Sequence, residues 1–301
     1  MAYHESVLLK ECIEGLAIKP DGIYVDVTFG GGGHSKAIME CLGDGGRLIA
    51  FDQDTDALAN AFDDKRLTLV HANFADLKKF LRLHGITKVD GILADLGVSS
   101  YQFDTAGRGF SYRFDGPLDM RMNQQAGQSA SDVLNTYGEE ALVNMFSEYG
   151  EVPNSKRLAK AVIEKRMIAH FDTIQSLMDL LQTTIIGDRW KYLSQVFQAI
   201  RMEVNQETNV LKSFLEQCGE VLKEDGRLAV ITFHSIEDRL VKQYMKNGVF
   251  EDEPKKDMYG RFYAPFKVIT KKPIVATAEE QKGNTRSRSA KLRIGAKKME
   301  E

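Results

Sequence analysis

Four consecutive glycines, residues 30–33, follow a short apolar run at residues 23–27 and precede a polar segment that begins with His34. Glycine tolerates positive φ and has no Cβ, so a backbone of this kind can turn sharply and approach a bound ribose or phosphate closely. The spacing therefore indicates a nucleotide-type ligand held at the end of a strand.

Two familiar glycine patterns do not fit this segment. A phosphate-binding loop needs Lys followed by Ser or Thr after its last glycine, but Lys36 is followed by Ala37. A dinucleotide fingerprint that starts at Gly30 or Gly31 would place Ser35 or Lys36 where Gly or Ala is required. The remaining interpretation is a short loop that binds an adenosine-type cofactor through the ribose hydroxyls of that cofactor.

Two acids accompany the loop. Asp26 lies four residues before Gly30, and Asp52 ends the next apolar run, residues 47–51. An ionised carboxylate accepts two hydrogen bonds at once, so Asp52 can hold the vicinal diol of a ribose. An NAD enzyme would use its acid in the same way, and a helix cap before residues 54–56 is the structural alternative. We favour ribose binding because the acid falls at a strand end opposite the glycine loop.

The elements that must position these residues form an alternating pattern. Further apolar runs occur at residues 47–51, 67–70, 89–94 and 227–233, with helical stretches between the first four runs of the chain. This alternation predicts a parallel sheet of an α/β fold, in which ligands gather at the carboxyl ends of the strands. The positions that follow the runs are residues 30–34, Asp52, Asn73, Phe74, residues 95–100 and residues 234–235.

About 130 residues separate the fourth run from the fifth, which is far more than an ordinary connection. The intervening sequence is helical, with a predicted capping box at Thr136 and Glu139 and a helix after Pro153. A further helix is expected at residues 200–222, closed by a turn at residues 224–226. We therefore expect one domain made of residues 1–124 and 196–301, and an inserted helical domain of residues 125–195 for substrate recognition.

The amino-acid composition argues against several classes of protein. The 301 residues are 43% hydrophobic, which is enough for real cores, and the net charge of −3 does not indicate nucleic-acid binding. Three cysteines lie far apart without CxxC spacing, which argues against a disulfide framework and a zinc site, and no metal site is predicted. The sequence shows no leader peptide and no apolar run near the roughly 18 residues needed to cross a bilayer, so a cytoplasmic protein is expected.

Positive charge is nevertheless clustered in two places. A solvated helix face is the plainer explanation of the first cluster alone, but two clusters on an acidic chain favour an RNA or DNA partner. The clusters are Lys156, Arg157, Lys160, Lys165 and Arg166 on one helix, and Lys282, Arg286, Arg288, Lys291, Arg293, Lys297 and Lys298 in a tail without acids.

The chemistry that fits is transfer to a nucleophile that needs little activation. None of the cysteines sits at a strand end, which argues against covalent catalysis by a thiol. If a sulfonium cofactor binds, its methyl group is already activated, and the protein mainly aligns the nucleophile and excludes water. Residues 95–100, with a carboxylate and two hydroxyls, could align an exocyclic amine; a polar strand-to-loop turn explains this segment equally well.

Several long strings of the chain match one known family. They are HESVLLKE at residues 4–11, DVTFGGGGHS at 26–35, DLGVSS at 95–100 with Gln102 and Asp104, RGFSYRFDGPLDMRM at 108–122, FQAIRMEVN at 197–205, TFHSIEDR at 232–239 and TRSRSAKLR at 285–293. On these strings the chain resembles the RsmH (MraW) family of S-adenosylmethionine-dependent methyltransferases nearly from end to end.

The resemblance implies a Rossmann-like class I methyltransferase sheet with an inserted helical domain. It implies S-adenosyl-L-methionine as cofactor and, as substrate, the exocyclic N(4) amine of a cytidine in the decoding region of 16S ribosomal RNA within the small ribosomal subunit. No membrane partner is implied, and the protein would be a monomer or a homodimer. The cofactor contacts carried over by position are Gly32, Gly33, His34, Asp52, Phe74, Asp95 and Gln102.

Substrate contacts are expected in two segments. The loop at residues 108–122 is predicted to face the substrate through Arg113, Asp115, Asp119 and Arg121, although a structural loop held by internal ion pairs is the alternative. In the tail, Arg286 and Arg288 are expected to contact RNA phosphates.

Four residues near the strand ends complete the expectations. Ser99 is the candidate for orienting the amine. A capping box formed by Ser235 and Asp238 would explain much of residues 232–239 and leaves His234 without a role. Two other functions stay open at this point: a non-enzymatic RNA-binding assembly factor and, with less support, an NAD-dependent oxidoreductase.

Overall fold

The computed structural model describes residues 6–251, 253–254, 258–260 and 262–299. His4, the first residue of one family string, lies outside the described residues. The chain divides into two compact units, the first made of Met1–Gly97 and Asn209–Glu301 and the second of Val98–Thr208. The predicted insertion, residues 125–195, lies within the second unit, which begins earlier and ends later in the sequence. The role of the insertion in substrate recognition stays a prediction.

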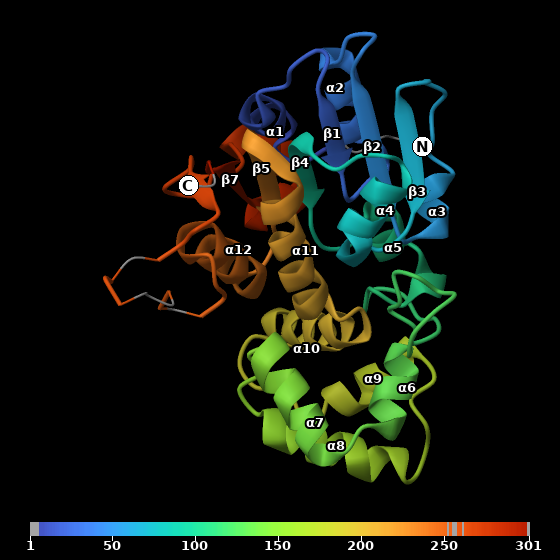
Figure 1. Cartoon of the computed structure of the whole chain (residues 1–301). Helices are drawn as coiled ribbons and strands as arrows, with labels where there is room; N and C mark the ends of the chain where they lie inside the picture. Colours follow the sequence, from blue (N-terminus) through green and yellow to red (C-terminus); the bar gives the residue numbers. More distant parts are fainter. Residues whose placement is uncertain (1–5, 252, 255–257, 261, 300–301) are drawn as a thin grey trace. The chain divides into compact units, whose positions relative to one another are not determined.

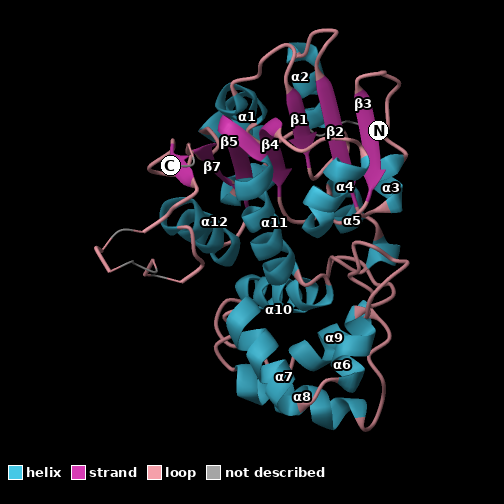
Figure 2. Ribbon diagram, viewed as in Figure 1, coloured by secondary structure: helices cyan, strands magenta, loops and turns pink. Residues whose placement is uncertain are grey.

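The first unit contains a seven-stranded sheet with the strand order β3-β2-β1-β4-β5-β7-β6 (Figures 1 and 2). Strands β1 to β5 are parallel, and β7 runs antiparallel between β5 and β6. This confirms the predicted α/β sheet. The strands are β1 (Ile23–Asp26), β2 (Arg47–Asp52), β3 (Leu67–His71), β4 (Val89–Asp95), β5 (Leu222–Thr232), β6 (Phe266–Val268) and β7 (Lys291–Lys297).

Residues 91–94 of β4 and residues 228–231 of β5 are continuous apolar runs, as expected of central strands that pair with a neighbour on each side. Ile92, Leu93 and Ala94 have no exposed surface. In the parallel register Asp52 lies opposite His71 and Asp95 lies opposite Ile231, so the carboxyl ends of these strands share one edge of the sheet.

Helices complete the first unit. Cys12 and Leu16 of α1 pack with Tyr24 of β1 and Ile294 of β7 in one buried cluster, which ties segments far apart in the sequence to the same core. The helical elements are α1 (Leu9–Leu16), α2 (Gly33–Cys41), α3 (Thr55–Leu58), η1 (Phe74–Asp76), α4 (Leu77–Leu83), α11 (Glu207–Val221, from Asn209 onward), α12 (Ser235–Asn247), α13 (Ala278–Gly283) and η4 (Thr285–Ser289).

The second unit is helical and has its own core, which includes Phe146, Leu158, Phe171, Leu193 and Ile200. The predicted helix after Pro153 is confirmed as α8. The elements are α5 (Ser100–Asp104), η2 (Ala106–Arg108), α6 (Ala130–Thr136), α7 (Glu139–Asn144), η3 (Met145–Tyr149), α8 (Ser155–Arg166), α9 (Ile174–Leu181) and α10 (Arg189–Val204).

The predicted capping box at Thr136 and Glu139 is wrong. The box forms one helix earlier, where the Ser129 hydroxyl accepts from Asp132 N and the Asp132 carboxylate accepts from Ser129 N. Thr136 ends α6 and donates its hydroxyl to the Asp132 carbonyl oxygen, and Gly138 precedes α7. Both positions carry a capping signature, but the Thr136 hydroxyl is already used on the carbonyl oxygen of its own helix.

The expected single helix at residues 200–222 is wrong as well, because α10 ends at Val204 and α11 begins at Glu207. Gln206 has φ 50°, a left-handed conformation that interrupts a right-handed helix. The expected turn at residues 224–226 is incorporated into β5, where Asp225 has φ 59° and the pairing with β4 shifts register.

In the part of the chain that the structure describes, no helix is both long and apolar enough to cross a bilayer.

Candidate active site

The glycine loop connects β1 to the N-terminus of α2. Gly30 and Gly32 have φ 50° and 76°, which favour glycine, and the carbonyl oxygen of Gly30 accepts a hydrogen bond from Asn60 Nδ2 at 3.0 Å. A Cβ on Gly33 would collide with the Ser6 hydroxyl oxygen. The loop thus presents the start of α2, where the first backbone amides have no partner inside the helix and the helix dipole is positive.

Asp52 closes this loop from the neighbouring strand. Its Oδ2 accepts from Gly30 N at 2.8 Å and its Oδ1 accepts from Asp54 N at 2.9 Å. The N-cap of α3 is Asp54, whose own carboxylate accepts from Asp56 N, so Asp52 is not the helix cap. Each Asp52 oxygen keeps a second lone pair for a ligand hydroxyl. Burial raises the pKa of Asp52 to about 6, and the two backbone amides oppose this shift.

Asp95 ends β4 and is held by Thr28, whose Oγ1 accepts from Asp95 N at 2.7 Å. Its Oδ1 is buried and has no hydrogen-bond partner among the described residues. Burial raises the pKa of Asp95 to about 6, while the charges of His34, when protonated, and of Arg286 act in the opposite direction. A buried carboxylate oxygen without a donor is costly, so this atom marks a place where a ligand donor fits.

His34, the second residue of α2, is almost fully buried. Its Nε2 lies 3.0 Å from the carbonyl oxygen of Val7, which can only accept, so Nε2 carries a proton. The other ring nitrogen, Nδ1, lies 3.8 Å from Asp95 Oδ2. His34 therefore packs at the helix start with its ring beside the Asp95 carboxylate.

Asp26 holds the strand end and the helix together. Its carboxylate accepts from Thr28 N at 3.0 Å and from the Ser35 hydroxyl at 2.7 Å, and it has no exposed surface. Thr28 and Ser35 are positioning residues that the sequence analysis missed. Their signal was present in the string DVTFGGGGHS, in which short hydroxyl side chains flank the glycines.

Phe74 begins η1 directly after β3 and is partly buried. Its ring packs edge-on against Phe214, with centroids 5.2 Å apart and an angle of 68°. The preceding Asn73 accepts from Ala75 N and donates to the Gln53 side chain at 2.8 Å. Phe74 thus has one supported edge and a remaining surface on which an aromatic base can pack.

Six of the seven predicted cofactor residues belong to the first unit, and all six lie at or just after the carboxyl ends of β1 to β4. The structure thus brings together Gly32, Gly33, His34, Asp52, Phe74 and Asp95. The seventh, Gln102, belongs to the second unit, as does Ser99. These two residues form a capping box at the start of α5, in which Ser99 Oγ accepts from Gln102 N and Gln102 Oε1 accepts from Ser99 N.

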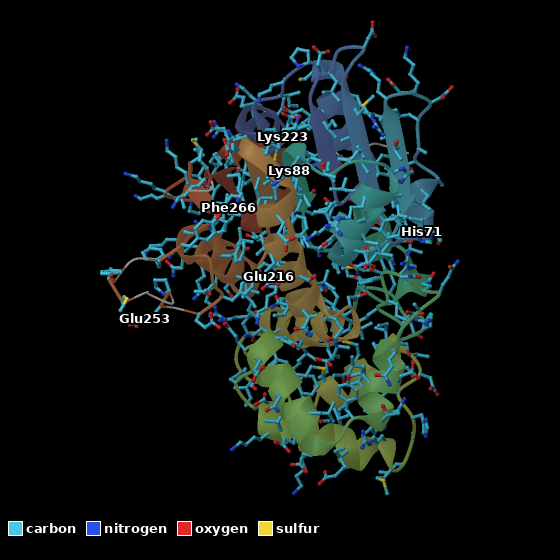
Figure 3. The ribbon with its side chains drawn as sticks, viewed as in Figure 1. His71, Lys88, Glu216, Lys223, Glu253 and Phe266 are labelled. Carbon is cyan, nitrogen blue, oxygen red and sulfur yellow. The ribbon has the colours of Figure 1, made fainter. Side chains whose placement is uncertain are left out.

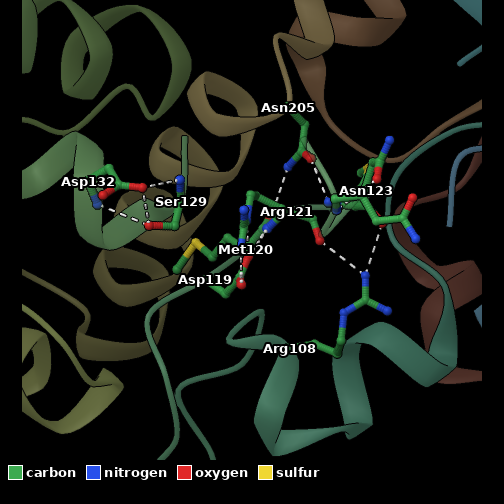
Figure 4. A network of polar contacts seen from close by, with 10 residues as sticks. Arg108, Asp119, Met120, Arg121, Asn123, Ser129, Asp132 and Asn205 are labelled. Atoms are coloured by element: carbon green, nitrogen blue, oxygen red, sulfur yellow. Dashed lines mark hydrogen bonds and ion pairs between the residues drawn. The ribbon is translucent and has the colours of Figure 1, made fainter. Parts of the chain in front are cut away.

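The loop at residues 108–123 is held by its own polar contacts (Figure 4). Arg108 is 3% exposed and donates to the carbonyl oxygens of Arg121 and Met122, each at 3.0 Å. Asn205 donates to Met120 O and accepts from Met122 N, each at 2.8 Å. Through these contacts the segment at residues 197–205 holds the loop at residues 108–122 in place within the second unit.

The charged residues predicted to face the substrate are largely engaged inside this unit. Asp119 and Arg121 pair with each other through two contacts of 2.8 Å, and Asp115 accepts from the amides of Gly116 and Gln175. Arg113 pairs with Asp104 but is exposed. Their substrate role stays a prediction, and the pairing agrees with the alternative of a loop held by ion pairs.

The basic tail is less exposed than the sequence indicates. Arg293 is buried in β7 and pairs with Asp238 at 2.6 Å, and Lys297 is buried and donates to Tyr263 Oη. Two of the tail's cations are therefore buried in this strand. Arg286 is partly buried and Arg288 is exposed, both in η4.

The basic helix is α8, and two of its cations serve the second unit. Arg166 donates to the carbonyl oxygens of Leu134 and Tyr137, and Arg157 donates to that of Thr183. Lys160 lies 3.8 Å from Glu164 on the same helix. Part of the basic cluster therefore satisfies carbonyl oxygens at the ends of neighbouring helices.

The predicted capping box of Ser235 and Asp238 is wrong. His234 is the N-cap of α12 without a side-chain cap, Asp238 pairs with Arg293, and Glu237 accepts from Phe233 N at 2.9 Å. Both ring nitrogens of His234 are buried without a hydrogen-bond partner among the described residues, although Nε2 lies 3.1 Å from Glu237 Oε1. The sequence analysis gave Glu237 no role.

Two other features lie outside this site. Burial raises the pKa of the Cys12 and Cys218 thiols, so neither supplies a reactive thiolate. A hollow of about 390 Å³ lies at the amino ends of β4 and β5, the edge opposite the glycine loop, and Figure 3 labels two of its lysines. It is lined by Lys88, Leu222, Lys223, Glu224, Lys297 and Lys298.

Comparison with known proteins identifies the family to which the chain belongs. The model of the MraW methylase family matches residues 1–298. A protein named ribosomal RNA small subunit methyltransferase H from Flavobacterium johnsoniae is 56% identical over 298 residues, covering 99% of this chain and 98% of its own. A protein of the same name from Bacteroides thetaiotaomicron is 52% identical over 299 residues, covering 99% and 98%.

Among solved structures, a SAM-dependent O-methyltransferase from Thermotoga maritima covers 100% of this chain and 69% of its own, with 10% identity and a TM-score of 0.41. The family assignment depends on the family model and the curated relatives. With the glycine loop, the two strand-end carboxylates and a match over nearly the whole sequence, the chain belongs to the MraW methylase family of S-adenosyl-L-methionine-dependent methyltransferases.

Proposed function

We propose that this protein transfers the methyl group of S-adenosyl-L-methionine to the exocyclic N(4) amine of a cytidine in the decoding region of 16S ribosomal RNA, within the small ribosomal subunit of the cytoplasm. The match to relatives named ribosomal RNA small subunit methyltransferase H, at 52 to 56% identity, supports the substrate class. The site residues named below support the cofactor.

The single observation that carries the proposal is the pair of strand-end carboxylates beside the glycine loop. Asp52 has a free lone pair on each oxygen for the two ribose hydroxyls, and the buried Asp95 Oδ1 has no hydrogen-bond partner among the described residues. An ammonium group, such as that of the methionine part of the cofactor, would supply the missing donor and charge.

The glycine loop fits the same ligand. Any side chain on Gly33 would collide with Ser6, and Gly32 has a left-handed φ, so the loop exposes backbone in place of side chains. When bound, the sulfonium cofactor supplies an activated methyl group, and the remaining work is alignment and exclusion of water. Phe74 offers a surface for the adenine ring.

The residues that would align the amine stay a proposal. Ser99 Oγ accepts one hydrogen bond, from Gln102 N, and keeps a lone pair that can accept from an amine N–H. An aromatic amine loses its proton readily once it is methylated, so water can take the proton and no dedicated base is required. Arg286 and Arg288 remain the candidates for RNA phosphates.

The test is direct. Purified small subunits that lack the modification are incubated with the protein and labelled methyl donor, and the labelled nucleotide is mapped by mass spectrometry. We expect one labelled cytidine, with the methyl group on N(4), and no label with the Asp52→Asn variant. Tight binding to the subunit without methyl transfer would favour the assembly-factor alternative, and thermal stabilisation by NAD in place of S-adenosyl-L-methionine would favour the oxidoreductase.

A further inference from the structure

Trp190 is an exposed aromatic side chain with a built support. It is the second residue of α10 and is 61% exposed. Its ring stacks on that of Tyr112, with centroids 6.0 Å apart and an angle of 26°. Tyr112 in turn packs edge-on against Phe197, with centroids 5.3 Å apart and an angle of 80°, and Phe197 is 5% exposed.

This support makes the ring rigid. Phe197 belongs to the buried core of the second unit, and Tyr112 packs against that core. The Tyr112 hydroxyl also lies 3.5 Å from the Ser194 hydroxyl on the same helix as Trp190. A flat ring that is fixed from behind and open to solvent loses little conformational entropy when a second flat ring stacks on it.

The charges around the ring are mostly positive. The Arg189 guanidinium lies 5.6 Å from the centroid of the Trp190 ring, and Lys191 is exposed beside it. The nearby acid, Asp188, uses its carboxylate to accept from Lys191 N as the N-cap of α10. Arg113, next to Tyr112, lies over the Phe103 ring at 4.7 Å. A cation over the ring and others beside it complement a polyanion.

We propose that Trp190 and Tyr112 form a stacking platform for unpaired nucleobases of single-stranded RNA, with Arg189 and Lys191 contacting the adjoining phosphates. Aromatic platforms with basic rims bind single strands in this way, because every base has a face that can stack. The proposal rests on the proposed function, since it names an RNA surface of the same enzyme. It is separate from the cofactor residues of the first unit.

The chain offers a sharp test because Trp190 is its only tryptophan. Tryptophan emission of the full chain therefore reports on this ring alone. We expect a pyrimidine-rich single-stranded RNA ten-mer to quench the emission saturably, and an abasic oligomer of equal length to quench it much less. Equal quenching by the two oligomers would show that only phosphates are sensed, and no quenching by either would also overturn the platform.

Variants separate stacking from folding. With fluorescein-labelled RNA and anisotropy, Trp190→Ala is expected to weaken binding about tenfold and Trp190→Phe to stay within about threefold of wild type. Ile168→Ala, at a side chain that is 84% exposed, is the matched control and should not change the affinity. Wild-type affinity of Trp190→Ala would contradict the proposal.

Two further measurements distinguish a failure of the stacking platform from a failure of the proposed function. Trp190→Ala should bind S-adenosyl-L-methionine with unchanged affinity in calorimetry. If the wild type shows the quenching but labels no nucleotide in the small subunit, the proposed function fails and the platform stands. If Trp190→Ala loses binding to the small subunit while naked RNA never quenches the wild type, the ring contacts protein and the platform is overturned.

Discussion

The glycine edge of the first unit and the loop at residues 108–123 of the second unit both concentrate charged residues, yet the structure treats them differently. At the glycine edge, Asp95 keeps an oxygen without a donor among the described residues, and Asp52 keeps a lone pair on each oxygen. In the loop, Asp119 and Arg121 satisfy each other, and Arg108 is used on backbone carbonyls.

The difference lies in the hydrogen-bonding capacity that folding leaves unused. Most buried polar groups in a scaffold are satisfied by the protein, because an unsatisfied buried group costs roughly 1 to 3 kcal/mol. The groups proposed to bind the cofactor are left partly open by the protein, and Thr28 holds the backbone of one of them, Asp95, in place. The density of charged residues in the sequence does not distinguish a ligand site from a scaffold. The following predictions test whether unused hydrogen-bonding capacity distinguishes them.

The largest expected effect belongs to the scaffold. Arg108→Met removes two charge-assisted hydrogen bonds to buried carbonyl oxygens, and we expect a loss of about 4 kcal/mol in the free energy of unfolding of the second unit. Urea unfolding followed by circular dichroism measures it. The matched control is Arg113→Met, at an exposed pair, where the change should stay below about 1 kcal/mol. Equal losses in the two variants would show that burial of Arg108 does not matter.

The next effect belongs to the site. Asp52→Asn keeps the shape but removes the charge that strengthens hydrogen bonds from ribose hydroxyls, so affinity for S-adenosyl-L-methionine should fall about a hundredfold, or about 3 kcal/mol. Isothermal titration calorimetry gives the value. Asp64→Asn, whose carboxylate pairs with Arg66 elsewhere in the unit, is the control and should bind as the wild type does. Wild-type affinity of Asp52→Asn would remove Asp52 from the site.

Two neighbouring glycines offer a finer comparison. Gly32→Ala places a side chain at φ 76° and 3.1 Å from the Phe29 ring, and the melting temperature should fall by an amount that corresponds to about 2 kcal/mol. At Gly31 an added Cβ meets no atom within 4 Å, so Gly31→Ala should fold as stably as the wild type. If Gly31→Ala keeps its stability and loses cofactor affinity, the ligand itself passes over Gly31.

The smallest effect for a single group is a dependence on pH. The pKa values of Asp52 and Asp95 are both raised to about 6 by burial, and the ionised forms are the acceptors, so each carboxylate should weaken cofactor binding about tenfold between pH 7 and pH 5. The stability of the ligand-free protein responds with the opposite sign, because these two groups bind protons more readily when folded and lose that contribution as pH rises through 6. Calorimetry from pH 5 to 8 tests the first statement; an affinity that does not change over this range contradicts it.

Much of the fold could be predicted from the sequence. Continuous apolar runs marked the buried strands, and the rule that ligands gather at strand carboxyl ends selected Asp52, Phe74 and Asp95 before their contacts were known. The MraW family membership that the strings indicated is confirmed. Helix ends were predicted less well, because capping signatures at Thr136 and Ser235 are short and occur without a cap wherever the chain has another use for the side chains.

The contacts of charged side chains could not be predicted at all. Nothing local to Arg293 indicates that Asp238, 55 residues away in sequence, neutralises it. The same holds for Arg108, whose acceptors are backbone carbonyl oxygens and therefore leave no mark in the sequence. Such pairings depend on tertiary structure, which is why the sequence of the tail does not show that Arg293 and Lys297 are buried.

The interruption of the sheet by the second unit has a consequence for synthesis of the chain. Strand β4 pairs on one side with β1, which precedes it, and on the other with β5, which begins only at Leu222. As the polypeptide leaves the ribosome, the whole second unit emerges while one edge of the apolar β4 still lacks its neighbour. An unpaired apolar edge is prone to aggregate. Rapid translation or chaperone shortage should therefore harm the yield of this protein at the stage of the half-made sheet, before any site has formed.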